Sequence, residues 1–486
     1  MILKKSVLLL ACVLLASLTP AFGDEAGPAN KSGPAPETGP APETLTYGRL
    51  GTVTLYHESP HPHHVVLFLS GDGGWNKGVV DMARVLAGMD SVVAGINLPR
   101  YLKQLAATKE ACSYPAADLE GLSKVIQKKL GFTAYETPVL VGYSSGATLV
   151  YAVLVQAPPN TFRGAISMGF CPDLPLKRPF CEGHGLKGEP GPQGKGISFL
   201  PTDTLEQPWI AFQGDSDKLC FKKDVVRYVA KVKGAETVLL PKVGHGFGKQ
   251  DRWVPQFRQS FDRLVGPEKA AARPAAPKEL ADLPLVEVPA RGASGDTLAV
   301  ILSGDGGWAG LDREVAGALA EKGVPVVGLD SLRYFWTART PDGASQDLAR
   351  ILRHYLAAWG RKEAVLIGYS LGADVLPFMA QRLPADLLGR VRLITLLGPD
   401  RSASFEFHVG EWLGLGGSGE QPVLPEVRKL AGHHVLCLYG KREDDSLCPQ
   451  LAPALGKAVA LSGAHHFGGD YGQVAGLILA EARIGE

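Results

Sequence analysis

The sequence lacks the patterns that mark several classes of protein. Its 486 residues carry 50 Lys and Arg against 49 Asp and Glu, a formal net charge of +1, so no basic excess supports a nucleic-acid partner. No pair of cysteines has C-x-x-C spacing, so neither a zinc site nor another cofactor is expected. No Gly-X-Y period runs through the 59 glycines, which excludes a collagen. Past the N-terminus, no run of about 18 consecutive apolar residues predicts a membrane span.

The N-terminus has the pattern of an export signal. Two lysines precede an apolar run from Val7 to Leu18, and Ala21-Phe-Gly23 resembles a cleavage site. This pattern predicts a signal peptide over residues 1–23 and a mature protein in the periplasm. The alternative, a membrane anchor, is disfavoured because the run is short.

The cysteines outside this leader are even in number, which suggests disulfides in an exported protein. Cys437 and Cys448 are the only pair in the second half of the chain. The pairing among the other four stays open: Cys112, Cys171, Cys181 and Cys220.

The chain is a duplication of one domain. Ser70-Gly-Asp-Gly-Gly-Trp75 recurs as Ser303-Gly-Asp-Gly-Gly-Trp308, an offset of 233 residues. Several other motifs recur in the same order, among them Gly142-Tyr-Ser-Ser-Gly146 as Gly368-Tyr-Ser-Leu-Gly372. The period is too long for a solenoid and fits two tandem domains.

Composition sets the expected boundaries. Two segments rich in Pro, Ala and Gly read as a tether and a linker. The expected order is a signal peptide (1–23), a tether (24–44), an N-terminal domain (45–265), a linker (266–282) and a C-terminal domain (283–486). A Gly-rich insert at 181–196 is expected to be a loop.

Both halves alternate short apolar runs with helical patterns. In the second half, strands are expected at 298–303, 324–330, 363–369, 391–398 and 433–440, with helices at 311–322 and 345–359. Continuously apolar strands are typical of a parallel sheet buried on both faces. The sequence therefore predicts an α/β fold: two tandem α/β-hydrolase-like domains, each a mostly parallel sheet flanked by helices.

Each half contains the residues of a serine hydrolase. Ser370 and Ser144 lie in G-x-S-x-G motifs between an apolar strand and a helical stretch, the context of a nucleophile elbow. His465 and His245 follow the last expected strand and are candidate general bases. His465 rather than His466 corresponds to His245 when the H-x-F-G motifs are aligned.

The acid that orients each histidine is less clear in the second half. Gly214-x-x-Asp217 favours Asp217 in the first half. Alignment from the cysteine makes Asp445 its equivalent, with Glu443 and Asp444 as alternatives. We expect a Cys437–Cys448 disulfide to close this loop and hold the acid.

Backbone N–H groups are expected to form the oxyanion holes. One donor directly follows each nucleophile: Leu371 in the second copy and Ser145 in the first. The other is expected in the Gly-rich SGDGGW loop, at Asp305 or Gly306 and, in the first copy, at Asp72 or Gly73.

These motifs resemble the AcvB/VirJ family of exported bacterial virulence proteins. The resemblance rests on SGDGGW, SLRYFWTARTP, GYSLGAD, YGKREDDSLCP and GAHHFGGDY, and it covers essentially the whole chain. It implies an α/β hydrolase that cleaves the aminoacyl ester of lysyl- or alanyl-phosphatidylglycerol in the periplasm, supporting membrane lipid homeostasis and virulence. Ser370, His465 and an acid at 443–445 would be its catalytic set.

The implied substrate suggests binding residues and partners. A cationic amine would be met by Asp400, Asp374 or Asp305, and a phosphate by Arg333. The implied partner is an aminoacylated phospholipid at the membrane surface, with proteins of a secretion system as further partners. The alternatives are a general secreted carboxylesterase or lipase, and a non-catalytic periplasmic partner of a type IV secretion system. The sequence leaves open the aminoacyl group, the activity of the first half and the oligomeric state.

Overall fold

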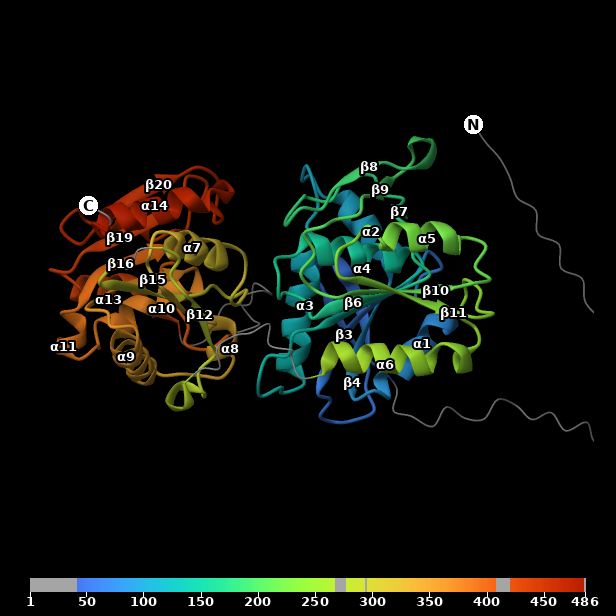
Figure 1. Cartoon of the computed structure of the whole chain (residues 1–486), viewed down its shortest axis with the longest axis horizontal. Coiled ribbons are helices and arrows are strands. Elements are labelled where there is room, and N and C mark those ends of the chain that lie inside the picture. Colours follow the sequence, from blue (N-terminus) through green and yellow to red (C-terminus); the bar gives the residue numbers. More distant parts are fainter. Residues whose placement is uncertain (1–41, 267–276, 293–294, 408–419, 485–486) are drawn as a thin grey trace, which may run out of the picture. The chain divides into compact units, whose positions relative to one another are not determined.

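The fold is known from a computed structural model that describes residues 42–266, 277–292, 295–407 and 420–484. The expected signal peptide lies outside these residues, as does nearly all of the expected tether. No helix among the described residues is long and apolar enough to cross a bilayer. The two halves of the chain each form an α/β domain, and the elements are labelled in Figure 1.

The N-terminal domain is built on an eight-stranded sheet of order β1-β2-β4-β3-β5-β6-β10-β11. The six strands from β4 to β11 are parallel, and β1 and β2 are antiparallel additions at one edge. The strands are β1 (Glu43–Tyr47), β2 (Gly51–Tyr56), β3 (His64–Leu69), β4 (Ser91–Ile96), β5 (Val139–Tyr143), β6 (Gly164–Met168), β10 (Trp209–Gly214) and β11 (Ala235–Leu240). The helices are α1 (Lys77–Ala87), α2 (Leu98–Ala107), α3 (Pro115–Lys129), α4 (Ser145–Gln156), α5 (Lys222–Val229) and α6 (Val254–Val265).

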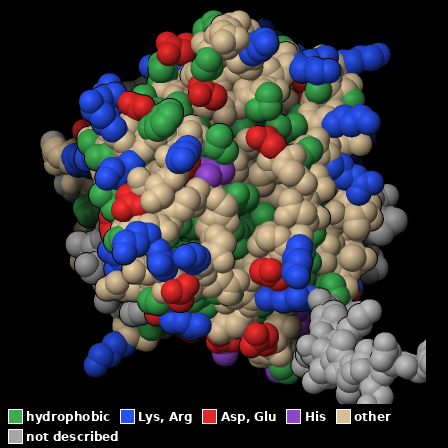
Figure 2. Space-filling view, turned by 90° about the vertical axis from the view of Figure 1, so that its right-hand side faces the viewer, with side chains coloured by type: hydrophobic (Ala, Val, Ile, Leu, Met, Phe, Trp, Pro, Cys, Tyr) green, Lys and Arg blue, Asp and Glu red, His purple; other side chains and the backbone are tan. Residues whose placement is uncertain are grey.

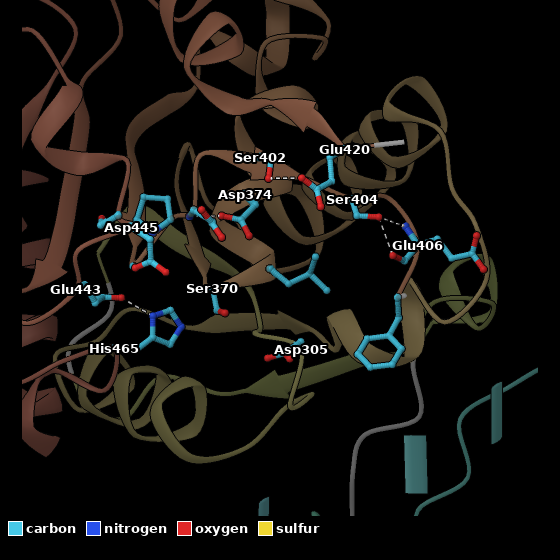
Figure 3. Close-up of a pocket in the computed structure, with 16 residues that line it drawn as sticks. Asp305, Ser370, Asp374, Ser402, Ser404, Glu406, Glu420, Glu443, Asp445 and His465 are labelled. Carbon is cyan, nitrogen blue, oxygen red and sulfur yellow. Dashed lines mark hydrogen bonds and ion pairs between the residues drawn. The ribbon is translucent and has the colours of Figure 1, made fainter. Parts of the chain in front are cut away.

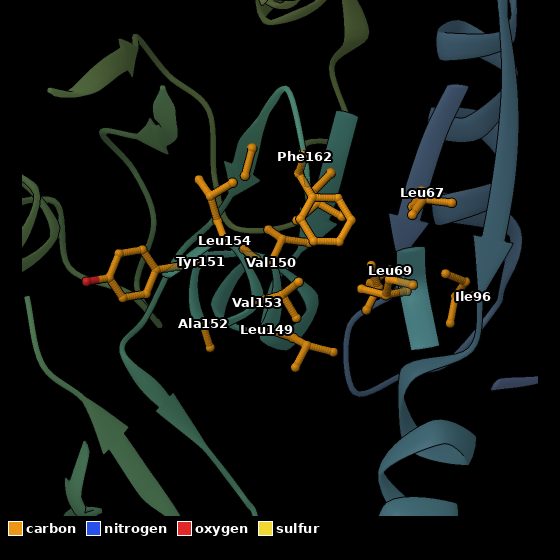
Figure 4. Packing of buried hydrophobic residues seen from close by; sticks show 14 of the residues in the cluster. Leu67, Leu69, Ile96, Leu149, Val150, Tyr151, Ala152, Val153, Leu154 and Phe162 are labelled. Carbon is orange, nitrogen blue, oxygen red and sulfur yellow. The ribbon is translucent and has the colours of Figure 1, made fainter. Parts of the chain in front are cut away.

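Alternating side chains of the strands feed two cores, one on each face of this sheet. Leu67 and Leu69 of β3 pack with α2, α3, α4 and α5, whereas Val66 and Phe68 pack with α1 and α6. Figure 4 shows the first core, in which α4 presents a continuously apolar run to the sheet. Burial on both faces explains why the strands read as unbroken apolar runs.

The C-terminal domain repeats this plan with seven strands, in the order β12-β14-β13-β15-β16-β19-β20. All neighbours are parallel except β12 and β14. The strands are β12 (Leu285–Val288), β13 (Thr297–Leu302), β14 (Val326–Leu329), β15 (Glu363–Tyr369), β16 (Val391–Leu397), β19 (Val435–Gly440) and β20 (Lys457–Leu461). The helices are α7 (Gly310–Glu321), α8 (Ser331–Tyr334), α9 (Pro341–Ala358), α10 (Leu371–Ala380), α11 (Ala385–Leu388), α13 (Val423–Lys429) and α14 (Tyr471–Glu481). One face packs against α7 and α14, and the other against α9, α10 and α13.

The structure differs from the sequence-based expectation in several segments, two of which belong to the N-terminal domain. Strand β1 starts at Glu43, inside the expected tether, because its residues pair with Gly51–Leu55 of β2. The Gly-rich insert is not only a loop. Its strand β8 (Gly188–Pro190) pairs with β9 (Ile197–Phe199), which pairs with β7 (Asp173–Leu174).

Three disulfides are formed. Cys437–Cys448 is the pair expected for the C-terminal domain. The N-terminal domain has Cys112–Cys181, which ties the segment before α3 to the insert, and Cys171–Cys220, which joins the loops that follow β6 and β10. The loops after β6 and β10 both lie at the edge of the sheet where the parallel strands have their carboxyl ends.

Candidate active sites

Each candidate nucleophile stands in a sharp turn between a strand and a helix. Ser144 separates β5 from α4, and Ser370 separates β15 from α10. Their φ angles are +56° and +51°, a conformation that residues with a side chain rarely adopt. The strained turn points each hydroxyl away from the sheet at the carboxyl ends of the strands, as a nucleophile elbow requires.

Close backbone packing explains the glycines of both elbows. A Cβ on Gly146 would lie 2.3 Å from the carbonyl oxygen of Leu69, and a Cβ on Gly372 would lie 2.2 Å from that of Leu302. No side chain fits at either position. The helix behind each serine therefore packs directly on the neighbouring strand.

The N-terminal domain contains a complete Ser–His–Asp arrangement. The Ser144 hydroxyl lies 2.9 Å from His245 Nε2, and His245 Nδ1 lies 2.8 Å from Asp217 Oδ2. The second oxygen of Asp217 accepts hydrogen bonds from the backbone N–H groups of Leu219 and Cys220. Because the carboxylate only accepts, Nδ1 of a neutral His245 carries the proton and Nε2 is free to accept the serine proton.

In the C-terminal domain the structure brings Glu443 to His465. Glu443 Oε1 contacts His465 Nδ1, and Oε2 accepts the backbone N–H of Gly440. His465 and Ser370 line the same cavity, although no direct hydrogen bond joins these two described side chains. His466 instead lies 3.0 Å from the Tyr369 hydroxyl, through its Nδ1.

The first choice for the acid, Asp445, is therefore wrong in its geometry: Asp445 lines the cavity, and neither it nor Asp444 bonds the imidazole. Alignment from the cysteine failed because this loop is longer in the second copy. Cys448 lies five residues after Glu443, whereas Cys220 lies three residues after Asp217. Counting from the last glycine of the strand gives the observed pairs, Gly214-x-x-Asp217 and Gly440-x-x-Glu443. That spacing is the signal in the sequence that would have favoured Glu443 over Asp445.

The electrostatics of the Glu443–His465 pair favour a charged imidazole. Burial lowers the pKa of His465, but the hydrogen bond and charge of Glu443, with the charges of Asp305 and Asp445, outweigh it and raise this pKa above its usual value. Burial raises the pKa of Glu443, yet its bonds to His465 and to Gly440 N–H bring the net shift below its usual value. Glu443 is thus an anion suited to stabilise an imidazolium.

The loops expected to supply oxyanion donors lie beside the nucleophiles. Cβ positions built on Gly304 and Gly71 fall 3.4 Å and 2.9 Å from the Cβ atoms of Ser370 and Ser144. Asp305 and Asp72 directly follow these glycines, whereas Gly306 and Gly73 are one residue farther away. The other proposed donors, Leu371 and Ser145, begin α10 and α4, so their N–H groups have no partner within the helix.

A cavity of about 280 Å³ opens at Ser370, and its lining is strongly acidic. Ser370 lies in the middle of the lining, with Asp305, Asp374 and Asp445 around it (Figure 3). No Lys or Arg is among the lining residues. The carboxylates that line the cavity are Asp305, Asp374, Asp400, Glu406, Glu420, Glu443 and Asp445.

Of the four candidate binding residues, three line this cavity: Asp305, Asp374 and Asp400. Asp374 and Asp400 both line it, and Asp374 Oδ1 accepts the backbone N–H of Asp400 at 2.6 Å. Arg333 does not line it, because its guanidinium lies beside Asp330 on the same short helix segment. A phosphate bound inside this cavity would therefore not meet Arg333.

Sequence reasoning missed Glu406 and Glu420, which come from the segments around the small β17–β18 pair (Ser402–Ala403 with Gln421–Pro422). It also missed Asp312, a buried residue of α7. Burial raises the pKa of Asp312 well above its usual value, while the N–H of Gly304, in the oxyanion loop, bonds it and lowers this pKa in part. No motif marks any of these positions.

The N-terminal domain has a different pocket beside its oxyanion loop. It has a volume of about 520 Å³ and includes Asp72. Most of its other lining is apolar, and its charged side chains besides Asp72 are cationic: Lys103, Lys177 and Arg178. The two copies thus share a serine elbow and a histidine–carboxylate pair, but the pockets beside their oxyanion loops differ in charge.

Comparisons with known proteins were made for the sequence and for the structure. The family model described as bacterial virulence protein (VirJ) matches residues 63–169 and 296–485. No curated protein matches the sequence.

Similar solved structures include the esterase Est1E from Butyrivibrio proteoclasticus, at 11% identity, covering 46% of this chain and 99% of that one, with a TM-score of 0.33. Esterase Est2 from Thermogutta terrifontis has 16% identity, covers 47% of this chain and 95% of that one, and has a TM-score of 0.32. The serine hydrolase XC6422 from Xanthomonas campestris has 19% identity, covers 46% of this chain and 93% of that one, and has a TM-score of 0.29.

The parallel sheets, the strained serine turns and the histidine–carboxylate pairs define a tandem α/β hydrolase of the serine type. The family match spans more than half of the chain and both domains. The chain belongs to the VirJ family of bacterial virulence proteins.

Proposed function

We propose that the chain is a periplasmic hydrolase that cleaves the aminoacyl ester of lysyl- or alanyl-phosphatidylglycerol at Ser370. The observation that supports this most is the acidic lining of the Ser370 cavity. An aminoacyl group carries a cationic amine, and a lysyl group carries two. Carboxylates around the nucleophile attract such a cationic acyl group, whereas they repel an anionic one.

The proposed reaction is acyl transfer to serine and then to water. The Ser370 hydroxyl attacks the ester carbonyl while His465 takes its proton, and the oxyanion is met by the N–H groups of Leu371 and Asp305. His465 then returns the proton to the departing hydroxyl of phosphatidylglycerol. Water, activated by His465, releases the amino acid from Ser370.

Asp374 and Asp400 are the residues we propose for binding the amine. They lie in the cavity and are joined by a hydrogen bond, so their positions are fixed relative to each other. Three disulfides and the lysine-preceded apolar N-terminus support export to the periplasm.

The test is release of free amino acid from vesicles of lysyl- and alanyl-phosphatidylglycerol by the purified mature protein. We expect activity to be lost with Ser370→Ala and retained with Ser144→Ala. Loss only with Ser144→Ala would move the activity to the N-terminal domain. Cleavage of a simple ester without release of amino acid would leave a general esterase, and no cleavage of any ester would favour a docking protein.

A matched pair of variants tests the binding residues. Asp400→Asn is expected to lower kcat/KM for lysyl-phosphatidylglycerol, because it removes a charge from the cavity without changing its shape. Arg333→Ala, which removes a charge outside the cavity, is expected to have little effect. Equal effects of the two variants would refute the proposed amine site.

A further inference from the structure

The loop that follows β10 in the N-terminal domain exposes large apolar side chains. In the described part of the chain, four such side chains are exposed, and three of them lie within eight residues: Leu219, Phe221 and Val226, with Leu239 farther along. Leu219 is 70% exposed and Phe221 is 60% exposed. Single exposed apolar residues are ordinary, but a cluster of them marks a surface that contacts something else.

Lysines surround these apolar side chains. Lys218, Lys222 and Lys223 are exposed. No ion pair joins any of the three to a described residue, although Lys222 is close enough to Asp215 to help lower the pKa of that carboxyl. The nearest carboxylate of α5, Asp224, is paired with Arg227 at 2.8 Å. We call the set Lys218, Leu219, Phe221, Lys222 and Lys223 the 218–223 loop. Its basic character is local, because the whole chain has a net charge of only +1.

The 218–223 loop is held rigidly. Cys220, between the two apolar residues, is buried and bonded to Cys171. The N–H groups of Leu219 and Cys220 donate to Asp217, and the carbonyl of Cys220 accepts from the Gln213 side chain at 2.8 Å. Because the backbone is fixed, Leu219 and Phe221 are presented outward at little further cost in entropy.

The second copy of the domain shows that the fold does not require this surface. Alignment of Cys220 with Cys448 places Leu447 opposite Leu219, and Leu447 is only 1% exposed. Proline stands in place of Phe221, and the three lysines are replaced by serine, glutamine and leucine. The exposed apolar and basic character therefore belongs to the N-terminal domain alone.

We propose that the N-terminal domain docks on an anionic phospholipid bilayer through the 218–223 loop. Leu219 and Phe221 enter the boundary between headgroups and acyl chains, and the three lysines contact lipid phosphates. Figure 2, drawn from the right-hand side of Figure 1, shows Lys and Arg side chains on that face, interspersed with hydrophobic side chains and with Asp and Glu. Since Asp217 directly precedes this loop, docking holds the Ser144 centre at the membrane surface.

The experiment measures co-sedimentation of the mature chain with vesicles. The chain carries Ser144→Ala and Ser370→Ala, so no lipid is consumed and the result does not depend on the proposed esterase activity. We expect binding to phosphatidylcholine vesicles that contain phosphatidylglycerol, weakened by salt, and little binding to phosphatidylcholine alone.

Two sets of variants locate the contact. Leu219→Ser with Phe221→Ser is expected to weaken binding at least about tenfold. Phe221 occupies the N-cap of α5, where Ser is favoured, so this change is not expected to unfold the helix. Lys222→Gln with Lys223→Gln is expected to cost about fivefold for each lysine. The matched control, Lys231→Gln with Lys233→Gln, removes the same charge beyond the end of α5 and should leave binding unchanged.

Several results would overturn the proposal. They are equal binding to both kinds of vesicle, no binding to either, and binding that the loop variants reduce no more than the control does. Thermal unfolding of each variant, compared with that of the parent chain, separates lost binding from lost folding. The two lysine pairs keep the test decisive even if the apolar variants prove unstable.

Discussion

Two single variants, Glu443→Gln and Asp445→Asn, distinguish the roles of the two carboxylates in the loop that follows β19. Glu443 accepts two hydrogen bonds, one oxygen facing His465 Nδ1 and the other facing Gly440 N–H. Its side chain is 8% exposed, so water cannot readily replace either partner. Asp445 faces the cavity and makes neither contact.

The expected loss follows from the chemistry of the amide. In the Glu443→Gln variant the side chain has one oxygen for two donors, so either Gly440 N–H loses its acceptor or the amide NH₂ turns toward His465. In the second case Nδ1 must accept, and the imidazole proton moves to Nε2, the atom that should take the proton of Ser370. We expect kcat to fall about 10³–10⁴-fold, or about 4 to 5.5 kcal/mol of transition-state stabilisation. For Asp445→Asn we expect at most about a tenfold loss in kcat/KM, because one charge near the substrate is removed.

The assay is steady-state release of amino acid from aminoacyl-phosphatidylglycerol vesicles, or of product from any ester the wild type cleaves. Circular dichroism of both variants verifies that the fold is intact. If Asp445→Asn reduced kcat as much as Glu443→Gln, Asp445 would be the orienting acid in the working enzyme and the assignment of Glu443 would be refuted.

Further predictions concern pH and stability. The pKa of His465 is raised, and the neutral imidazole is needed as the base, so kcat/KM should decline as the pH falls through a value above the usual pKa of about 6.5. Asp445→Asn removes a charge that raises this pKa, so it should move the acidic limb of the pH–rate profile to lower pH. An acidic limb that does not move would contradict the electrostatics. Replacing both Cys437 and Cys448 by Ala should lower the free energy of unfolding, measured by urea denaturation, by about 3 kcal/mol. An unchanged denaturation midpoint would argue against the Cys437–Cys448 disulfide. The pKa of Asp312 is well above its value in the unfolded chain, because burial disfavours the charged carboxylate. Between these two pKa values, the free energy of unfolding should fall by about 1.4 kcal/mol for each unit of rising pH. The stability of Asp312→Asn relative to the wild type should therefore increase with pH over this range, and a pH-independent difference in melting temperature would refute the shift.

The central strands were predictable from the sequence because burial on both faces makes them mostly apolar, with few polar positions. The expected strand at 363–369 matches β15 residue for residue. Strand β12 was missed because all of its residues are half-buried, so its pattern is weak. The pairing of β8 with β9 was missed because glycine and proline dominate the insert, and only the pairing of the backbone orders it.

The candidate sites were predictable where local backbone chemistry dictates the residue. The glycines and serine of each elbow follow from one strained turn, so the motif alone located Ser144 and Ser370. The acid was harder, because a carboxylate can reach the histidine from several loop positions and loop length differs between the copies. The cavity carboxylates Glu406 and Glu420 come from segments distant from the motifs, and only tertiary structure brings them to Ser370.

The backbone conformation of the two serines also sets a limit on how stable each domain can be. A residue with a side chain at such a φ angle costs about 1–3 kcal/mol, which the surrounding sheet and helix must offset. Alanine at either position would remove the hydroxyl and keep the strain, whereas glycine would remove both. Each domain is thus less stable than its hydrophobic core alone would make it, and the deficit is concentrated at its candidate nucleophile. The geometry that a nucleophile elbow requires therefore opposes stability at one φ angle in each half of the chain.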